Sequence, residues 1–143
     1  MLPDLDQIIA HHEAGHCVVA ITTGLKLRSV RMAFDDGKAD WLVRDNAHDR
    51  HMHALTLLAG PRAELRFVGS YSDARLAEKW QTHWRHDLYG VLKHCDGSIA
   101  EAITEVDHLV RRHWGAIKRV AAALLEAGQL TGREVEALMA QQA

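Results

Sequence analysis

The chain has 143 residues, 48% of them hydrophobic and 25% charged, and a formal net charge of −2. These values are typical of a single globular domain spanning residues 1–143, and they give no indication of a nucleic-acid or anionic-membrane partner. Two cysteines outside any CxxC pair, no basic leader and no apolar run of about 18 residues predict a cytoplasmic protein without membrane insertion.

The first predicted helix spans residues 5–23 and carries the most informative motif. Asp4 is its expected N-cap, and Gly24 suits the position after its end. Inside it, His12, Glu13 and His16 form a His-Glu-x-x-His sequence. Residues four apart share one face of a helix, so the two imidazoles can point at one ion.

This motif indicates a catalytic zinc site. Zinc binds neutral imidazole nitrogen, and three protein ligands leave a fourth position for water. Glu13 is then placed to take a proton from that water as it attacks a carbonyl. The alternative is that His12 and His16 are half-buried side chains bonded to backbone carbonyls. Finding the pair at this spacing, with Glu13 between, favours the metal.

A β-hairpin is predicted next. Alternating residues 30–34 and 41–43 flank Asp35-Asp36-Gly37, a sequence typical of a turn. The hairpin either offers an edge to an extended peptide or only covers the core.

The remaining chain is predicted to be helical. Helical spacing runs over residues 49–68, where Gly60-Pro61 should kink or break the helix. Shorter helices are expected over residues 72–84, with Ser72 as the cap, and over residues 87–95. Ser98 with Glu101 starts a long helix to residue 127 that Gly115 is expected to bend, and Thr131 with Glu134 starts the last.

A third zinc ligand is not identified by spacing alone. The metzincin pattern fails, because Thr22 stands where its third histidine belongs and Val19 where its glycine belongs. The candidates that remain open are His94, His108, Asp73, Asp87, Glu101, Glu105 and Asp107.

Three blocks resemble one known family. Residues 12–19 read HEAGHCVV, similar to the HEAGHAVV signature of FtsH-type ATP-dependent zinc metalloproteases. Residues 57–64 read LLAGPRAE, with Gly69 following, and resemble that family's LGGRAAEE helix. Residues 124–135 read LLEAGQLTGREV and resemble its closing segment. The resemblance covers the whole chain in order.

The resemblance implies a mainly α fold with a small β-hairpin, an FtsH-protease-domain-like zincin helical bundle. It implies Zn²⁺ held by His12, His16 and Asp87, with Glu13 as general base. Asp87 follows from the family's aspartate that opens a helix before leucine, and Asp73 is the second choice because the gap after Gly69 is long. For Glu64 the expectation is either a residue orienting a ligand histidine or a surface ion pair.

The implied activity is hydrolysis of peptides or unfolded proteins by a zinc metallopeptidase. The family's ATPase module and membrane helices have no counterpart in this sequence, so a separate ATPase is a possible partner. Two rival interpretations remain: a non-catalytic zinc module with a closed fourth position, and a regulatory or interaction domain that retains the fold without metal.

Overall fold

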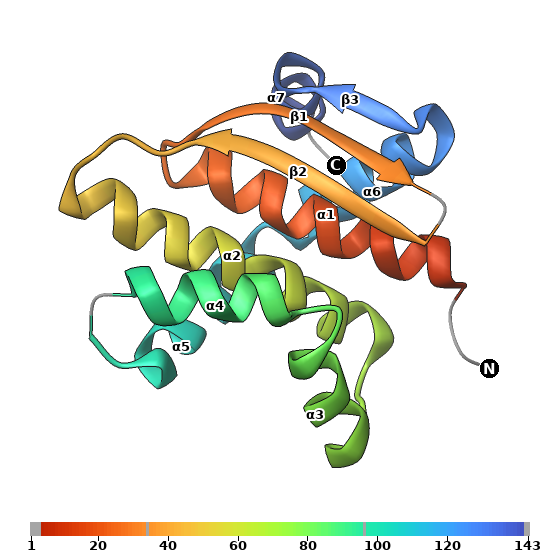
Figure 1. Ribbon diagram of the computed structural model, residues 1–143. Coiled ribbons are helices and arrows are strands. Elements are labelled where there is room, and N and C mark those ends of the chain that lie inside the picture. The colour runs from red at the N-terminus through yellow and green to blue at the C-terminus, as the bar shows by residue number, and fades with distance from the viewer. Residues whose placement is uncertain (1–3, 34, 96, 142–143) are drawn as a thin grey trace.

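A computed structural model describes residues 4–33, 35–95 and 97–141. The described chain is mainly helical with one small antiparallel sheet, which confirms the coarse fold class (Figure 1). Its elements are α1 (Leu5–Thr22), β1 (Lys26–Ala33), β2 (Asp36–Leu42), α2 (Ala47–Val68), α3 (Asp73–Gln81), α4 (Arg85–His94), α5 (Ile99–Arg112), α6 (Trp114–Ala127), β3 (Gln129–Thr131) and α7 (Gly132–Ala140).

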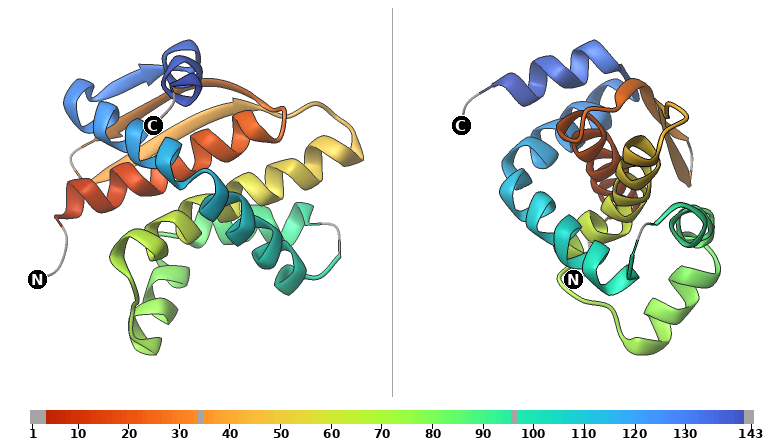
Figure 2. Two further views of the ribbon diagram at one scale, coloured as in Figure 1. Left: turned by 180° about the vertical axis from the view of Figure 1, so that it is seen from behind. Right: turned by 90° about the vertical axis from the view of Figure 1, so that its left-hand side faces the viewer.

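Helices α1 and α2 form the centre of the molecule, with the sheet on one side of α1 and α5 and α6 on another (Figures 1 and 2). Their close approach depends on small residues. A Cβ added at Gly15 of α1 would lie 2.6 Å from both the Ala59 carbonyl oxygen and the Ala63 Cβ of α2. The lack of a side chain at Gly15 therefore permits this close approach of α1 and α2.

The sheet has the strand order β2-β1-β3. Strand β1 ends at Ala33 and pairs it with Asp36, so Asp36 and Gly37 belong to β2. The predicted turn over Asp35-Asp36-Gly37 was therefore placed too late, and Phe34 lies outside the described residues. Strand β3 was not predicted, because three residues carry too little alternation to reveal a strand.

Gly60-Pro61 was expected to kink or break the helix, and the break is wrong, because α2 continues from Ala47 to Val68. Proline removes one intrahelical hydrogen bond, here the bond to the Leu57 carbonyl. Gly60 and Pro61 are both among the buried residues of α2. Packing of this length of helix against α1 outweighs the local cost.

The predicted long helix over residues 98–127 is in fact two helices. They meet at His113, whose φ of −104° and ψ of 19° leave the helical range, rather than at Gly115. Helix α5 packs on α2, whereas α6 packs on α1. A single straight helix cannot follow both, so the chain changes direction between them (Figure 2).

Several predicted helix starts are confirmed. The side chains of Ser72 and Ser98 accept hydrogen bonds from the backbone three residues ahead, and Thr131 and Glu134 form the full capping box. None of the helices in the described ranges combines the length and apolar character needed to cross a bilayer.

The contact at Gly15 generates a stability prediction. Gly15→Ala gains helix propensity but overpacks the α1–α2 interface, so we expect a net loss of about 1–3 kcal/mol of unfolding free energy. Gly115→Ala in α6 is the matched control, since its Cβ would meet only Arg119 Nη1 at 3.6 Å. That variant should be neutral or stabilised by up to about 1 kcal/mol. Urea denaturation of both variants checks this, and equal stabilities would contradict it.

Candidate metal centre and catalytic site

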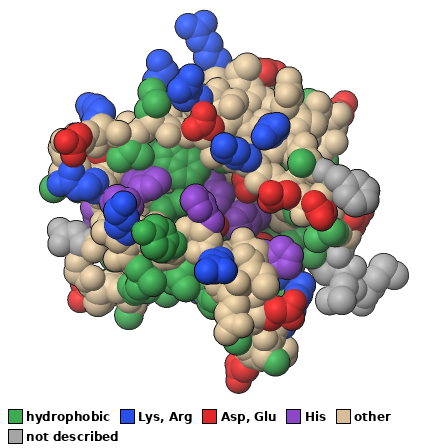
Figure 3. Space-filling model, in the orientation of Figure 1, with side chains coloured by type: hydrophobic (Ala, Val, Ile, Leu, Met, Phe, Trp, Pro, Cys, Tyr) green, Lys and Arg blue, Asp and Glu red, His purple; other side chains and the backbone are tan. Residues whose placement is uncertain are grey.

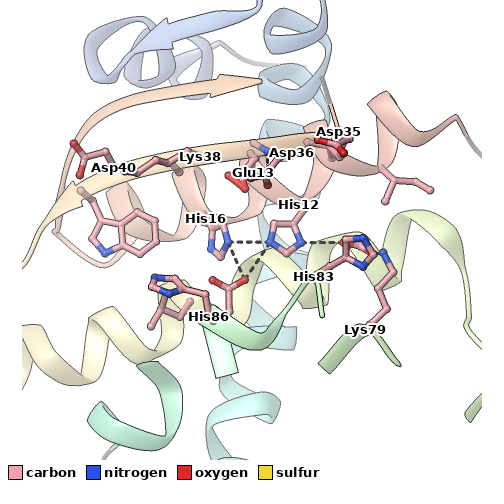
Figure 4. A pocket seen from close by; sticks show the side chains of 18 of the residues that line it. His12, Glu13, His16, Asp35, Asp36, Lys38, Asp40, Lys79, His83 and His86 are labelled. Carbon is pink, nitrogen blue, oxygen red and sulfur yellow. Dashed lines mark hydrogen bonds and ion pairs between the residues drawn. The ribbon is translucent and has the colours of Figure 1, made fainter. Parts of the chain in front are cut away.

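Two helices and the start of a third bring the predicted site residues together (Figure 4). His12 and His16 project from adjacent turns of α1, where His16 is only 4% exposed. Glu64 lies on the facing helix α2, and Asp87 lies in the first turn of α4. Both acids are buried, so the surface ion pair considered for Glu64 is excluded.

Each histidine has its Nδ1 atom engaged away from the centre. His12 Nδ1 lies 2.9 Å from Glu64 Oε1, and His16 Nδ1 lies 2.7 Å from the Thr56 carbonyl oxygen. Because these oxygens accept hydrogen bonds, they place a proton on each Nδ1 and orient the rings. Both Nε2 atoms consequently face the same point.

Three potential ligand atoms surround that point. His12 Nε2 and His16 Nε2 are 3.1 Å apart, and Asp87 Oδ2 lies 3.2 Å from the first and 3.4 Å from the second. Ligands about 2.0–2.1 Å from a tetrahedral zinc are separated from one another by roughly 3.3–3.4 Å. Two imidazoles and one carboxylate are also a donor set of catalytic zinc sites. The residues present therefore fit zinc.

Gly60 makes room for this arrangement. A Cβ at position 60 would collide with His16 Nε2 and would lie 2.7 Å from His12 Nε2. The floor beneath the two nitrogens is thus bare helix backbone. Gly60 is therefore required at this position because any side chain would occupy the space of the two imidazoles.

Glu13 lies beside the two histidines, on the side covered by β2. One of its carboxylate oxygens and one ring nitrogen each of His12 and His16 lie within 4.8 Å of one another. Its Oε2 atom is buried and has no hydrogen-bond partner among the described residues, and burial raises the pKa of this carboxyl group. Gly37 of β2 packs over it, since an added Cβ there would lie 2.6 Å from Glu13 Cγ. The edge strand therefore holds Glu13 against the site.

The electrostatics of the centre favour positive charge. Burial lowers the pKa of His12, but hydrogen bonds to Asp87 and Glu64 raise it to about 10. The pKa of His16 is also raised, because Asp87 outweighs burial. Although burial raises the pKa of Asp87, the two imidazoles hold it well below its usual range. The same field that holds a proton here would stabilise a metal cation.

Glu64 is held by donors on both carboxylate oxygens. Oε1 accepts from Trp84 Nε1 at 3.1 Å as well as from His12, and Oε2 accepts from Tyr71 OH at 2.7 Å and Lys79 Nζ at 2.8 Å. Burial raises its pKa, but His12, Lys79 and Tyr71 bring the pKa to about 2. Glu64 is therefore a carboxylate across the physiological pH range.

The centre opens into a cavity of about 520 Å³ between β2 and the helices α2 and α4. Histidines gather in this hollow (Figure 3). Its far wall includes Trp41, whose Nε1 donates to His53 Nδ1 at 2.9 Å, while Ile8 and Ile9 provide apolar lining near Glu13. The hollow is large enough for several residues of an extended peptide.

The other ligand candidates lie elsewhere. Asp73 is exposed at the start of α3, and Asp107 pairs with Arg62 at 2.7 Å. Glu105 lies 3.6 Å from His51, and His94 packs its ring against His53. His108 and Glu101 are exposed on α5. Of the residues left open by spacing, only Asp87 is recorded in contact with His12 and His16 within the described ranges.

Sequence reasoning missed three partners of Glu64. Trp84 and Lys79 fell within the helix predicted over residues 72–84 and Tyr71 just before it, and none of the three carried a signal that pointed to Glu64. A lysine in an exposed helix is ordinarily a solvated side chain. Only the contact with Glu64 reveals a different role.

No protein-family model matches the chain, and no curated protein matches it either.

The raised pKa of His12 predicts pH-dependent metal binding. Without metal, a proton on His12 stabilises the folded protein fully below about pH 6.5, and this contribution is lost as the pH rises toward about 10. Zinc must displace that proton, so its apparent affinity should rise about tenfold per pH unit for each proton released. Chelator competition between about pH 6 and 8 measures this. An affinity independent of pH would contradict the prediction.

Asp87 provides a second prediction. Asp87→Ala should lower zinc affinity more than about 100-fold, because the loss of an outer partner alone typically costs 10–100-fold. Asp73→Ala is the control and should retain wild-type affinity. Metal analysis after purification, followed by titration, compares them. Full zinc binding in Asp87→Ala would show that the third ligand is another residue.

Proposed function

We propose that this protein is a zinc-dependent metallopeptidase that hydrolyses peptides or unfolded proteins. The observation that carries the proposal is the triangle of His12 Nε2, His16 Nε2 and Asp87 Oδ2, with spacings of 3.1–3.4 Å, beside a buried carboxylate oxygen of Glu13 that has no hydrogen-bond partner among the described residues. A structural histidine pair does not require such an adjacent orphan. The donor set and the unpaired carboxylate together favour hydrolysis.

The residues divide the chemistry among themselves. His12, His16 and Asp87 would hold the ion, and Glu64 and the Thr56 carbonyl orient the two imidazoles. When bound, zinc acts as a Lewis acid that polarises the peptide carbonyl and makes water more acidic.

Glu13 moves the proton. Its carboxylate takes a proton from the water that attacks the carbonyl carbon, and then delivers it to the nitrogen of the departing amine as the C–N bond breaks. Burial under β2 raises its pKa, which brings the group closer to the operating pH that a proton-transfer residue needs.

The cleft dimensions limit the substrate. A hollow of about 520 Å³ between β2 and two helices accepts an extended segment rather than a folded domain. We propose that the fold is that of an FtsH-type peptidase domain, on the strength of the three sequence blocks and the helical arrangement. Where a substrate needs unfolding, a separate ATPase would supply it, and the reaction would take place in the cytoplasm.

Glu13→Gln tests this function directly. The variant keeps the shape of the side chain but cannot accept the proton, so we expect peptide cleavage to fall at least about 100-fold while zinc binding remains. An unfolded, fluorescently labelled protein is the substrate. Glu126→Gln, at an exposed position of α6, is the control variant. Unchanged cleavage in Glu13→Gln would overturn the mechanism. A wild-type protein that holds zinc and cleaves nothing would favour the non-catalytic zinc module.

A further inference from the structure

Helix α3 is attached to the rest of the molecule in an unusual way. It projects from the body in every view and packs mainly against α4 (Figures 1 and 2). A surface helix normally buries an apolar stripe. Trp80 of α3 is only partly buried, where it packs against the core and edge-on to Trp84, and the one residue of α3 that is fully buried is Lys79, which is 4% exposed. Lysine is almost never buried unless its charge is paired.

The partner of Lys79 is the carboxylate that holds a proposed metal ligand. Lys79 Nζ lies 2.8 Å from Glu64 Oε2, and the other oxygen, Oε1, lies 2.9 Å from His12 Nδ1. The ammonium group also lies 5.3 Å from the centre of the Tyr71 ring and 5.9 Å from that of Trp84. The lysine therefore occupies a pocket built for a cation, directly behind His12.

This contact limits how the Glu64 carboxylate can rotate. With Lys79 and Tyr71 on Oε2, rotation about the last side-chain bond would break two hydrogen bonds. Oε1 consequently stays directed at His12. A fixed acceptor at Nδ1 keeps a proton there and leaves Nε2 as the ring atom that faces His16 Nε2 and Asp87 Oδ2.

Stability alone does not account for a charged residue at this position. Apolar side chains in place of both members of a buried ion pair often preserve stability, so anchoring α3 does not in itself require a charge. An apolar side chain at position 79 alone would leave Glu64 without its countercharge. The consequence specific to the lysine charge is its effect on Glu64.

We propose that Lys79 is a positioning residue for the metal ligand His12, acting through Glu64. The inference rests on the metal site of the proposed function and not on peptide hydrolysis. It also couples two events: docking of α3 favours metal binding, and metal binding favours docking of α3 by the same factor.

The first test compares two substitutions in α3. Lys79→Met removes the charge and keeps the length of the side chain, and we expect zinc affinity to fall about 10–100-fold. Arg75→Met removes a positive charge from the partly exposed face of the same helix, where Arg75 pairs with Glu78. That control should stay within about threefold of wild type, as exposed ion pairs contribute little. Chelator competition measures both, and wild-type affinity in Lys79→Met would overturn the proposal.

A double-mutant cycle separates positioning from general destabilisation. If Lys79 acts through Glu64, adding Lys79→Met to Glu64→Gln should leave zinc affinity within about twofold of Glu64→Gln alone. A further fall of about 10–100-fold, the size expected for Lys79→Met alone, would overturn the proposal. The comparison holds even if Lys79→Met does not fold alone, because the double variant contains no unpaired buried charge at this position.

Hydrogen exchange gives a readout that does not depend on activity. Zinc should slow amide exchange in residues 73–81 of the wild type and should have no such effect in Glu64→Gln, whose neutral side chain breaks the coupling. Equal slowing in both proteins would overturn the proposed path through Glu64.

The outcomes also separate this inference from the proposed function. Lys79-dependent zinc affinity in a protein that cleaves no peptide would support the positioning role and overturn the peptidase. Undiminished zinc affinity in Lys79→Met, with peptide cleavage intact in wild type, would overturn the positioning role and support the peptidase. A wild-type protein that takes up no zinc would overturn both.

Discussion

The close contact between α1 and α2 is the constraint on which the rest of the structure depends. At Gly15 the helices meet without room for a Cβ, and at Gly60 the α2 backbone lies directly beneath the Nε2 atoms of His12 and His16. This separation lets His16 reach the Thr56 carbonyl and lets His12 reach across to α2. The direction in which the imidazoles point is thus a product of helix packing, since a larger separation of α1 and α2 would leave both Nδ1 atoms without acceptors.

Burial of many ionisable groups follows from this arrangement. Glu13, Glu64, Lys79 and Asp87 are each no more than 8% exposed. Isolated charges are costly in such surroundings, whereas paired and hydrogen-bonded ones are tolerated. Glu64 has donors on both oxygens, and Asp87 faces two imidazoles. Glu13 alone retains a buried oxygen with no partner among the described residues, and this exception marks the place where chemistry is proposed.

Sequence reasoning succeeded where local signals matched the tertiary outcome and failed where packing overrode them. Caps at Ser72, Ser98 and Thr131 were recognised because capping is a local interaction. The break expected at Gly60-Pro61 does not occur, because burial against α1 holds the helix together. The boundary at His113 was missed for the opposite reason: the apolar periodicity continues there while the packing partner changes from α2 to α1.

The sequence by itself determined the local half of the site. Helical spacing places two imidazoles on one face of α1 with a carboxylate beside them, and this needs only the geometry of 3.6 residues per turn. Only the tertiary structure decided the other half, since Glu64 is 52 residues and Asp87 is 75 residues from His12 along the chain. Family resemblance pointed to Asp87, but no local pattern pointed to Lys79. Such contacts depend on how whole helices pack, which short-range preferences along the chain do not specify.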